Sequence, residues 1–206
     1  MRLGLLAAVV ASFIAAGCAA PRALDPGKAE QIGQAFAAEV ANKKIPGAVI
    51  LVTRDGQVAY EKALGVQDPV TGAPMRMDSI FRIYSMTKPI VSVVAMQLVE
   101  EGRIGLDDPV SRYMPDLKGL KVGVEKDGKL EIVPTQREMT VRDLLRHTSG
   151  FTYGVFGKGL VKDLYKEHKV DANDITNAEL IRRLTKVPLM YQPGTVWEYG
   201  RSTDVL

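Results

Sequence analysis

The spacing of apolar residues along the chain predicts both helices and strands. The segment 29–43 repeats apolar residues at four-residue steps, as a helix with one buried stripe requires: Ile32, Phe36 and Val40. The apolar segments 48–53 and 58–64 then flank Asp55-Gly56, a pair typical of two-residue β-hairpin turns. This part of the chain is therefore predicted to be a helix followed by an antiparallel hairpin.

A second helix is predicted after Lys88. Its apolar residues recur at three- and four-residue spacings up to Gly102, where glycine supplies a stop: Ile90, Val91, Val94, Leu98 and Val99. Pro89 agrees with a helix start, because proline is tolerated there and not in a helix interior. The pattern predicts a buried helix with Ser85 at its N-terminus.

Ser85-Met86-Thr87-Lys88 places a hydroxyl three residues before an amine, so one helical turn puts both groups on the same face. A serine hydroxyl is a poor nucleophile until its proton is taken, and a lysine whose charge is disfavoured by burial can accept that proton. This is the chemistry of a serine acyl-transfer enzyme. The alternative is that Ser85 only caps the helix and that Lys88 is a solvated side chain.

Residues 117–139 predict another hairpin, because apolar residues alternate on both sides of a turn at residues 126–129. The segment has the character of an insertion, and two interpretations stay open: a flap beside a substrate cleft, or a hairpin exposed to solvent. Thr140 is expected to cap a short helix, and Thr176 with Glu179 forms a capping box ahead of another.

Five segments follow one another in an order that is more specific than any one of them. Together with Ser85-Met86-Thr87-Lys88 they are Phe81-Arg82-Ile83-Tyr84, Leu106-Asp107-Asp108-Pro109-Val110, Leu144-Leu145-Arg146-His147-Thr148-Ser149-Gly150 and Gln192-Pro193-Gly194-Thr195-Val196-Trp197-Glu198-Tyr199. From about residue 30 to its end, the chain resembles the penicillin-recognising serine hydrolases. The likeness is greatest to their class C β-lactamase-like branch and its family VIII esterase relatives.

That resemblance implies a fold and three residue roles. The fold is α+β of the α/β sandwich type, with an antiparallel central sheet flanked by helices and a mostly helical lobe. Ser85 resembles the acylated nucleophile, Lys88 the amine that helps to deprotonate it, and Tyr199 the tyrosine of the Y-x-N motif, which passes the proton to the leaving group. A nearby ammonium stabilises a phenolate and makes it a base. The alternative for Tyr199 is an aromatic side chain packed beside Trp197.

Two departures from the family pattern bear on the substrate and on the extent of the domain. Lactam-hydrolysing members have Asn two residues after the tyrosine, to meet an acylamino carbonyl, whereas this chain has Arg201. A simple ester lacks that group, which favours ester hydrolysis. Arg201 is itself a candidate for binding a substrate carboxylate, which would restore a preference for lactams or peptides, with a solvent-exposed side chain as the alternative. The family's third motif does not occur before Leu206, so we expect residues 21–206 to be the N-terminal portion of the domain, with its C-terminal part missing from this chain.

Other chemistries find little support. No serine lies in G-x-S-x-G, and no zinc, phosphate-loop or dinucleotide motif occurs, so no metal or cofactor is expected. His147 is interpreted as a turn residue rather than a general base, and His168 as a solvated side chain. The net charge of +3 comes from interspersed basic and acidic residues, which argues against a nucleic-acid partner.

The first twenty residues are predicted to be an export signal rather than part of the fold. Arg2 precedes the apolar run 3–16, which is too short for a transmembrane helix. Residues 15–18 resemble a lipobox, which predicts lipid attachment to Cys18 and hence to a membrane; ordinary cleavage near Ala19 or Ala20 is the alternative. The expected location is the periplasm or, for the lipidated form, the outer membrane of a bacterium.

Taken together, these patterns predict an exported serine hydrolase that cleaves a small carboxylic ester through an acyl-enzyme at Ser85. A β-lactamase or a D-amino-acid peptidase is the enzymatic alternative, with an amide as substrate. A penicillin-binding protein that is acylated without turnover, or a homologue without catalysis, is the alternative from another class.

Overall fold

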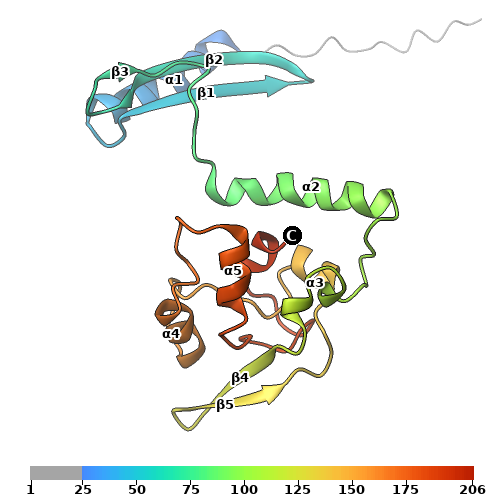
Figure 1. Cartoon of the computed structure of the whole chain (residues 1–206). Coiled ribbons are helices and arrows are strands. Elements are labelled where there is room, and N and C mark those ends of the chain that lie inside the picture. The colour runs from blue at the N-terminus through green and yellow to red at the C-terminus, as the bar shows by residue number, and fades with distance from the viewer. Residues whose placement is uncertain (1–24) are drawn as a thin grey trace, which may run out of the picture. The chain divides into compact units, whose positions relative to one another are not determined.

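The computed structural model describes residues 25–206 (Figure 1). The chain divides into two compact units, one ending at Arg82 and the other beginning at Ile83, and each is described by itself. The predicted export signal, with Cys18, lies outside the described residues. None of the helices in residues 25–206 combines the length and the apolar character needed to cross a membrane.

The first unit consists of one helix and a three-stranded antiparallel sheet of order β1-β2-β3. Its elements are α1 (Pro26–Ala41), β1 (Gly47–Arg54), β2 (Gln57–Asp68) and β3 (Ala73–Pro74). Asp25 caps α1, since its carboxylate accepts hydrogen bonds from the first N–H groups of the helix. Asp55 and Gly56 both have positive φ, as a two-residue hairpin turn requires. The predicted helix and hairpin are confirmed, but the predicted buried stripe of the helix is wrong, because Phe36 is 40% exposed and the buried residues of α1 are Ala29 and Gly33.

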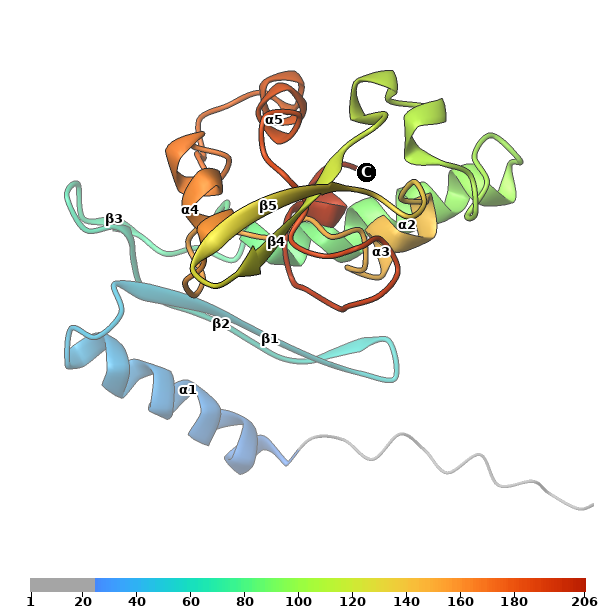
Figure 2. The same ribbon diagram turned by 90° about the horizontal axis from the view of Figure 1, so that it is seen from below.

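Helix α1 lies along the β1–β2 hairpin (Figure 2). The Tyr60 hydroxyl occupies the place that a side chain on Gly33 would fill, so a residue larger than glycine there would have to displace the end of the Tyr60 side chain. One turn earlier, Glu30 accepts a hydrogen bond of 2.7 Å from Lys62 of β2. The contact between Gly33 and the Tyr60 side chain, together with the ion pair between Glu30 and Lys62, thus connects α1 to β2.

The second unit contains four α-helices, a two-stranded hairpin and four short 3₁₀ helices among the described residues. They are η1 (Tyr84–Met86), α2 (Thr87–Glu100), η2 (Val110–Arg112), η3 (Pro115–Leu117), β4 (Lys121–Lys126), β5 (Lys129–Pro134), α3 (Val141–Leu145), α4 (Leu160–Glu167), α5 (Asn177–Leu184) and η4 (Arg201–Asp204). Its core is built by large side chains from most of these elements, including Leu144, Phe151, Tyr165, Leu184 and Leu189. Helices and antiparallel strands thus occur together, as the α+β class predicts.

The predicted caps of the short helices are present. Thr140 and Asp143 form a reciprocal capping box at the start of α3. The Thr176 hydroxyl accepts a hydrogen bond from the N–H of Glu179 at the start of α5, but the Glu179 carboxylate binds Arg182 and Arg183, so only half of the predicted capping box forms. These caps fix where each short helix begins, which matters because a helix this short is marginal without support from its ends and its packing.

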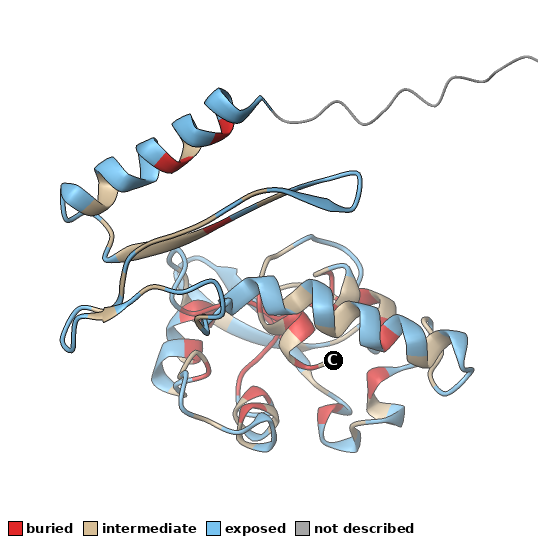
Figure 3. Cartoon of the chain, turned by 90° about the horizontal axis from the view of Figure 1, so that it is seen from above, coloured by how far each residue is buried: buried red, intermediate tan, exposed pale blue. Residues whose placement is uncertain are grey.

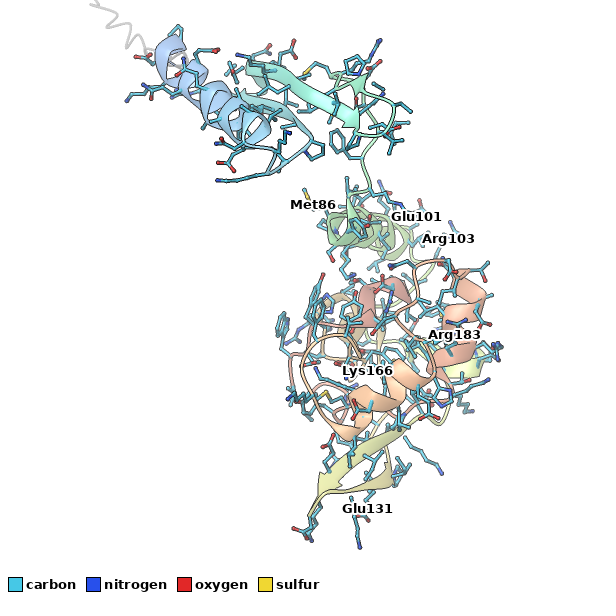
Figure 4. The ribbon with its side chains drawn as sticks, turned by 90° about the vertical axis from the view of Figure 1, so that its left-hand side faces the viewer. Met86, Glu101, Arg103, Glu131, Lys166 and Arg183 are labelled. Atoms are coloured by element: carbon cyan, nitrogen blue, oxygen red, sulfur yellow. The ribbon has the colours of Figure 1, made fainter. Side chains whose placement is uncertain are left out.

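The hairpin β4–β5 forms as predicted, with Asp127 and Gly128 at positive φ in its turn. It is neither a flap over the cavity that holds Ser85 nor fully exposed. Val122 is buried in the core, and the backbone of Leu189 pairs with β4. Figure 4 shows Glu131 of β5 far from Met86, the neighbour of Ser85. Packing against the core therefore overrides both sequence interpretations.

Helix α2 is only partly buried, which corrects the prediction of one buried apolar face (Figure 3). Ala95 is buried, and the residues one turn before and after it, Val91 and Leu98, are half-buried. Ile90 and Val94 are 57% and 51% exposed. The apolar residues of α2 occupy more than one side of the helix, so periodicity alone does not identify the buried side.

Candidate active site

Ser85 lies in η1, directly before α2, and it is exposed. Tyr84 before it has a φ of 44°, in the left-handed region that residues with side chains seldom adopt. Such a conformation is held only where its surroundings demand it, and it is common at functional sites. The serine therefore stands at the helix start, as predicted, but in the turn that leads into the helix.

The three predicted catalytic residues, Ser85, Lys88 and Tyr199, line one cavity of about 440 Å³. Arg201 lines it too. All of the lining residues belong to the second unit: Tyr84, Ser85, Thr87, Lys88, Tyr153, Val155, Phe156, Asp171, Asn173, Tyr199, Arg201 and Asp204.

Lys88 points into the second unit, and only 13% of its side chain is exposed. Among the described residues, its Nζ donates hydrogen bonds to Tyr153 Oη at 3.0 Å and to the Asp204 carboxylate at 3.4 and 3.5 Å. None of these partners is Ser85, so the expected direct contact between the serine and the lysine is not made. The solvated-lysine alternative is also wrong.

Tyr153 connects Lys88 to Asp204. Its Oη accepts the hydrogen bond from Lys88 and donates one to Asp204 Oδ2 at 3.1 Å. The three side chains come from α2, from the segment that follows Gly150, and from η4. Each contact joins residues that are far apart in the sequence, so the three side chains meet only when these parts of the unit fold together.

The surroundings set the charge of Lys88. Burial acts to lower its pKa, but the hydrogen bond to Tyr153 and the negative charge of Asp204 outweigh burial, and the pKa lies above the ordinary value. The sequence-based expectation of a lysine whose charge is disfavoured is therefore wrong. Burial raises the pKa of Tyr153, so its hydroxyl keeps its proton at neutral pH.

Tyr199 faces the same ammonium from another side. Lys88 Nζ lies 5.5 Å from the centroid of the Tyr199 ring and 5.7 Å from that of Tyr153. Trp197 stacks near Tyr199 with 6.4 Å between ring centroids, so the packing alternative describes part of its environment. Tyr199 therefore packs beside Trp197 and also lies close to the ammonium of Lys88.

The ring of His147 packs against the ring of Tyr199. It follows α3 with a φ of 56°, and its ring centroid lies 4.9 Å from that of Tyr199. Its Nδ1 accepts a hydrogen bond from the N–H of Gly200 at 3.4 Å. Burial and the nearby charge of Lys88 lower the pKa of His147, which keeps it neutral as an acceptor. The turn-residue interpretation is confirmed.

The Arg201 side chain is largely buried and is held by an ion pair. Its side chain is 13% exposed, and its Nε donates to Asp171 Oδ1 at 3.2 Å. The guanidinium carbon lies 4.8 Å from the centroid of the Tyr153 ring. Asp171 also accepts hydrogen bonds from the N–H groups of Gly154 and Val155. One carboxylate therefore joins the segment after Tyr153 to the segment after Tyr199.

Sequence reasoning missed Tyr153, Asp204 and Asp171. No local pattern distinguishes these three, because each acts through a partner distant in the sequence. The one available signal was position: Tyr153 closely follows the segment that ends at Gly150, and Asp204 closely follows Tyr199. In residues 25–206, no cluster of three or more His, Cys, Asp or Glu side chains is arranged to hold a metal ion.

Known proteins resemble this chain over most of its length. The Beta-lactamase family model matches residues 32–206. Esterase EstB of Burkholderia gladioli is 36% identical over 180 residues, which cover 86% of this chain and 43% of the esterase.

Two solved structures share the fold. EstCE1, "a hydrolase with promiscuous acyltransferase activity", has a TM-score of 0.69 at 27% identity and covers 87% of this chain and 45% of its own. Simvastatin synthase LovD of Aspergillus terreus has a TM-score of 0.69 at 29% identity, and the match covers 89% of this chain and 46% of the synthase. The chain thus spans less than half the length of each of these relatives. These similarities confirm the predicted fold class.

Proposed function

The chain belongs to the Beta-lactamase family, as its resemblance to penicillin-recognising serine hydrolases predicted, and from this premise we propose that Ser85 is the nucleophile of a serine hydrolase that cleaves small carboxylic esters. The observation that carries the proposal is the common cavity of Ser85, Lys88 and Tyr199. A nucleophile, a cation and a phenol in one cavity are the groups that acyl transfer needs.

In the proposed reaction, Tyr199 is the base and Lys88 is the cation that stabilises its phenolate. The phenolate takes the proton of Ser85 while Oγ bonds to the ester carbonyl carbon. The bond to the alcohol oxygen then breaks, and the proton passes from Tyr199 to the departing alkoxide. Water attacks the acyl group on Ser85, gives a proton through Tyr199 to the serine oxygen, and releases the acid.

An ester is the preferred substrate for two reasons. EstB, the esterase relative, is named for that activity. Arg201 also stands where lactam-hydrolysing members of the family place the amide that holds an acylamino group. Val155 and Phe156 add an apolar wall to the cavity, which suits a short acyl chain.

Arg201 supports a refinement of the substrate class. Its Nε is bound to Asp171, and one terminal nitrogen approaches Asp204 Oδ2 only to 4.0 Å. No hydrogen bond within residues 25–206 occupies either terminal nitrogen, so this edge of the guanidinium can bind a ligand in the cavity. This edge matches a carboxylate in a bidentate pair. We therefore assign to Arg201 the binding of a carboxylate on the substrate.

Export is a separate part of the proposal. The charged, apolar and small-residue stretches of residues 1–20 support an export signal, with lipid attachment to Cys18. In a bacterial host, mass spectrometry should find a diacylglyceryl group on a new N-terminal Cys18. A soluble periplasmic product that begins after Ala19 or Ala20 would refute lipidation.

A covalent probe tests the nucleophile. In the full protein, a fluorophosphonate should label Ser85, and Ser85→Ala should abolish labelling, whereas Ser92→Ala in the following helix, α2, should retain it. Steady hydrolysis of p-nitrophenyl butyrate is expected. A burst that stops after one equivalent would favour the penicillin-binding alternative, and an adduct on Ser149 would refute the assignment of Ser85.

A further inference from the structure

We infer that Tyr153 and Asp204 are positioning residues for Lys88: together they hold its side chain as a fixed ammonium between the two tyrosines of the cavity. Neither residue is proposed to touch the substrate. The inference rests on the proposed function, because it specifies how that site keeps its cation in place.

The donor count of Lys88 supports this arrangement. An ammonium has three N–H donors and no acceptor. One is directed at Tyr153 Oη at 3.0 Å, and one is shared between the two oxygens of the Asp204 carboxylate at 3.4 and 3.5 Å. The third remains for the cavity, where Ser85 and Tyr199 are. Two anchored donors fix the direction of the third, and a long flexible side chain thereby loses the freedom that would misplace its charge.

The hydroxyl proton of Tyr153 sets the direction of the hydrogen bonds among Lys88, Tyr153 and Asp204. Tyr153 Oη donates its hydrogen to Asp204 Oδ2 at 3.1 Å, so its lone pairs are left to accept from Lys88. The tyrosine is 8% exposed, and burial disfavours loss of its proton. Tyr153 and Tyr199 therefore have different tasks beside one ammonium, the first as a protonated tether and the second as the proton carrier.

Charged and titratable groups surround Lys88 from several elements. Asp204 and Arg201 come from η4, Tyr153 and Tyr199 from the segments on either side of α4 and α5, and His147 from the end of α3. The Arg201 guanidinium approaches Asp204 to 4.0 Å but pairs more closely with Asp171 at 3.2 Å. Asp204 is thus the nearest anion to Lys88, and Asp171 balances Arg201.

The charge of Asp204 can be removed with little change of shape by Asp204→Asn. Without that anion, the ammonium of Lys88 should lose its proton at lower pH, because a nearby opposite charge favours the charged form. The alkaline limb of kcat/KM for p-nitrophenyl butyrate should therefore move down by about one pH unit. Asp204→Glu should keep the limb closer to that of the wild type, and Tyr153→Phe should also move it down, because the hydrogen bond to Tyr153 raises the pKa of Lys88.

Asp163→Asn is the control, because Asp163 is an exposed carboxylate of α4 that lies outside the cavity and makes no hydrogen bond to Lys88. It should leave the position of the alkaline limb unchanged. A limb that stays in place in both Asp204→Asn and Tyr153→Phe, with turnover merely lower, would make the pair structural and overturn the inference.

A second readout separates this inference from the proposed hydrolase activity. NMR titration of the lysine ¹³Cε signals, assigned with Lys88→Met, reports the ionisation of Lys88 without any substrate. Its titration should move to lower pH in Asp204→Asn even if the protein hydrolyses no ester. An unchanged titration refutes the inference, whereas unlabelled Ser85 with a shifted titration refutes only the proposed function.

Discussion

Lys162 and Glu198 form an ion pair at 2.8 Å, in which 10% of the lysine side chain is exposed. Glu198 also accepts a hydrogen bond from the Thr152 hydroxyl, and its N–H donates to the carbonyl oxygen of His147. Because Tyr199 follows Glu198 directly, these contacts fix the backbone from which the phenol extends. Helix α4 thus supports the site without lining the cavity that holds Ser85.

Replacing Lys162 should lower both the stability of the protein and its hydrolase activity. In Lys162→Met the Glu198 carboxylate loses its cation in a largely buried position, and we expect the free energy of unfolding to fall by about 2 kcal/mol. Urea denaturation of the full protein measures this loss. Lys166→Met is the control, because Lys166 lies on the same helix in an exposed pair with Asp163 and should cost less than about 0.5 kcal/mol. Equal losses in the two variants would contradict the anchoring role.

Tyr199→Phe should remove the hydroxyl that we propose as the proton carrier and keep the ring. We expect kcat/KM for p-nitrophenyl butyrate to fall by about 10²–10⁴-fold, the usual contribution of a positioned acid–base group. The ring contacts with His147 and Trp197 persist, so the melting temperature should change little. Tyr191→Phe, outside the cavity, is the control for loss of a tyrosine hydroxyl. Activity that survives in Tyr199→Phe would leave the proton transfer to another group.

Much of the fold follows from the sequence because its signals are local. The turn pair Asp55-Gly56 and the cap at Thr140 each specify a backbone conformation within a few residues, and the structure forms both. The burial of α2 does not follow in the same way. Ile90 and Val94 satisfy the helical spacing but are exposed, because periodicity records which residues are apolar and not which side the rest of the fold covers.

The site could be predicted only as far as its motifs reach. Ser85, Lys88 and Tyr199 were found from their segments, and the structure places them in one cavity. The charge of Lys88 could not be predicted, because it depends on Tyr153 and Asp204, which meet it only after folding. Burial alone would lower its pKa, and the sequence gives no measure of the opposing contacts.

Lowering the pH should reveal how much the Asp143 carboxylate contributes to the stability of the fold. The carboxylate is buried, which acts to raise its pKa, but the hydrogen bonds from Arg137, Thr140 and Thr148 outweigh burial and lower it. A group with a lowered folded pKa stabilises the protein above its unfolded pKa, and that stability is lost as the pH falls through the folded value.

Asp143→Asn should therefore be less stable than the wild type by about 2 kcal/mol at pH 7, and the difference should shrink below about pH 4. Urea denaturation at several pH values measures it. Asp163→Asn, an exposed carboxylate of α4, should show no such pH-dependent difference. A difference for Asp143→Asn that stays constant down to pH 3 would mean that folding does not lower the pKa of this carboxylate.

Arg201 should determine selectivity rather than the rate on every ester. We expect the full protein to hydrolyse p-nitrophenyl butyrate well and nitrocefin slowly, because the amide that orients an acylamino group is replaced. A p-nitrophenyl ester with a carboxylate at the end of its acyl chain should be preferred over its methyl ester. Arg201→Met should reduce that preference by about tenfold or more, as a charge-assisted hydrogen bond contributes about 1.5–3 kcal/mol.

The variants separate the possible roles of this side chain. Arg142→Met is the control, since Arg142 pairs with the exposed Asp107 outside the cavity and should leave the preference unchanged. If Arg201→Met slows the charged and neutral esters equally, the guanidinium only supports Tyr153 and Asp171, and the carboxylate-binding assignment is wrong. A wild type that prefers nitrocefin would contradict the esterase proposal, and a fall of that activity in Arg201→Asn would mean that Arg201 binds the lactam substrate instead.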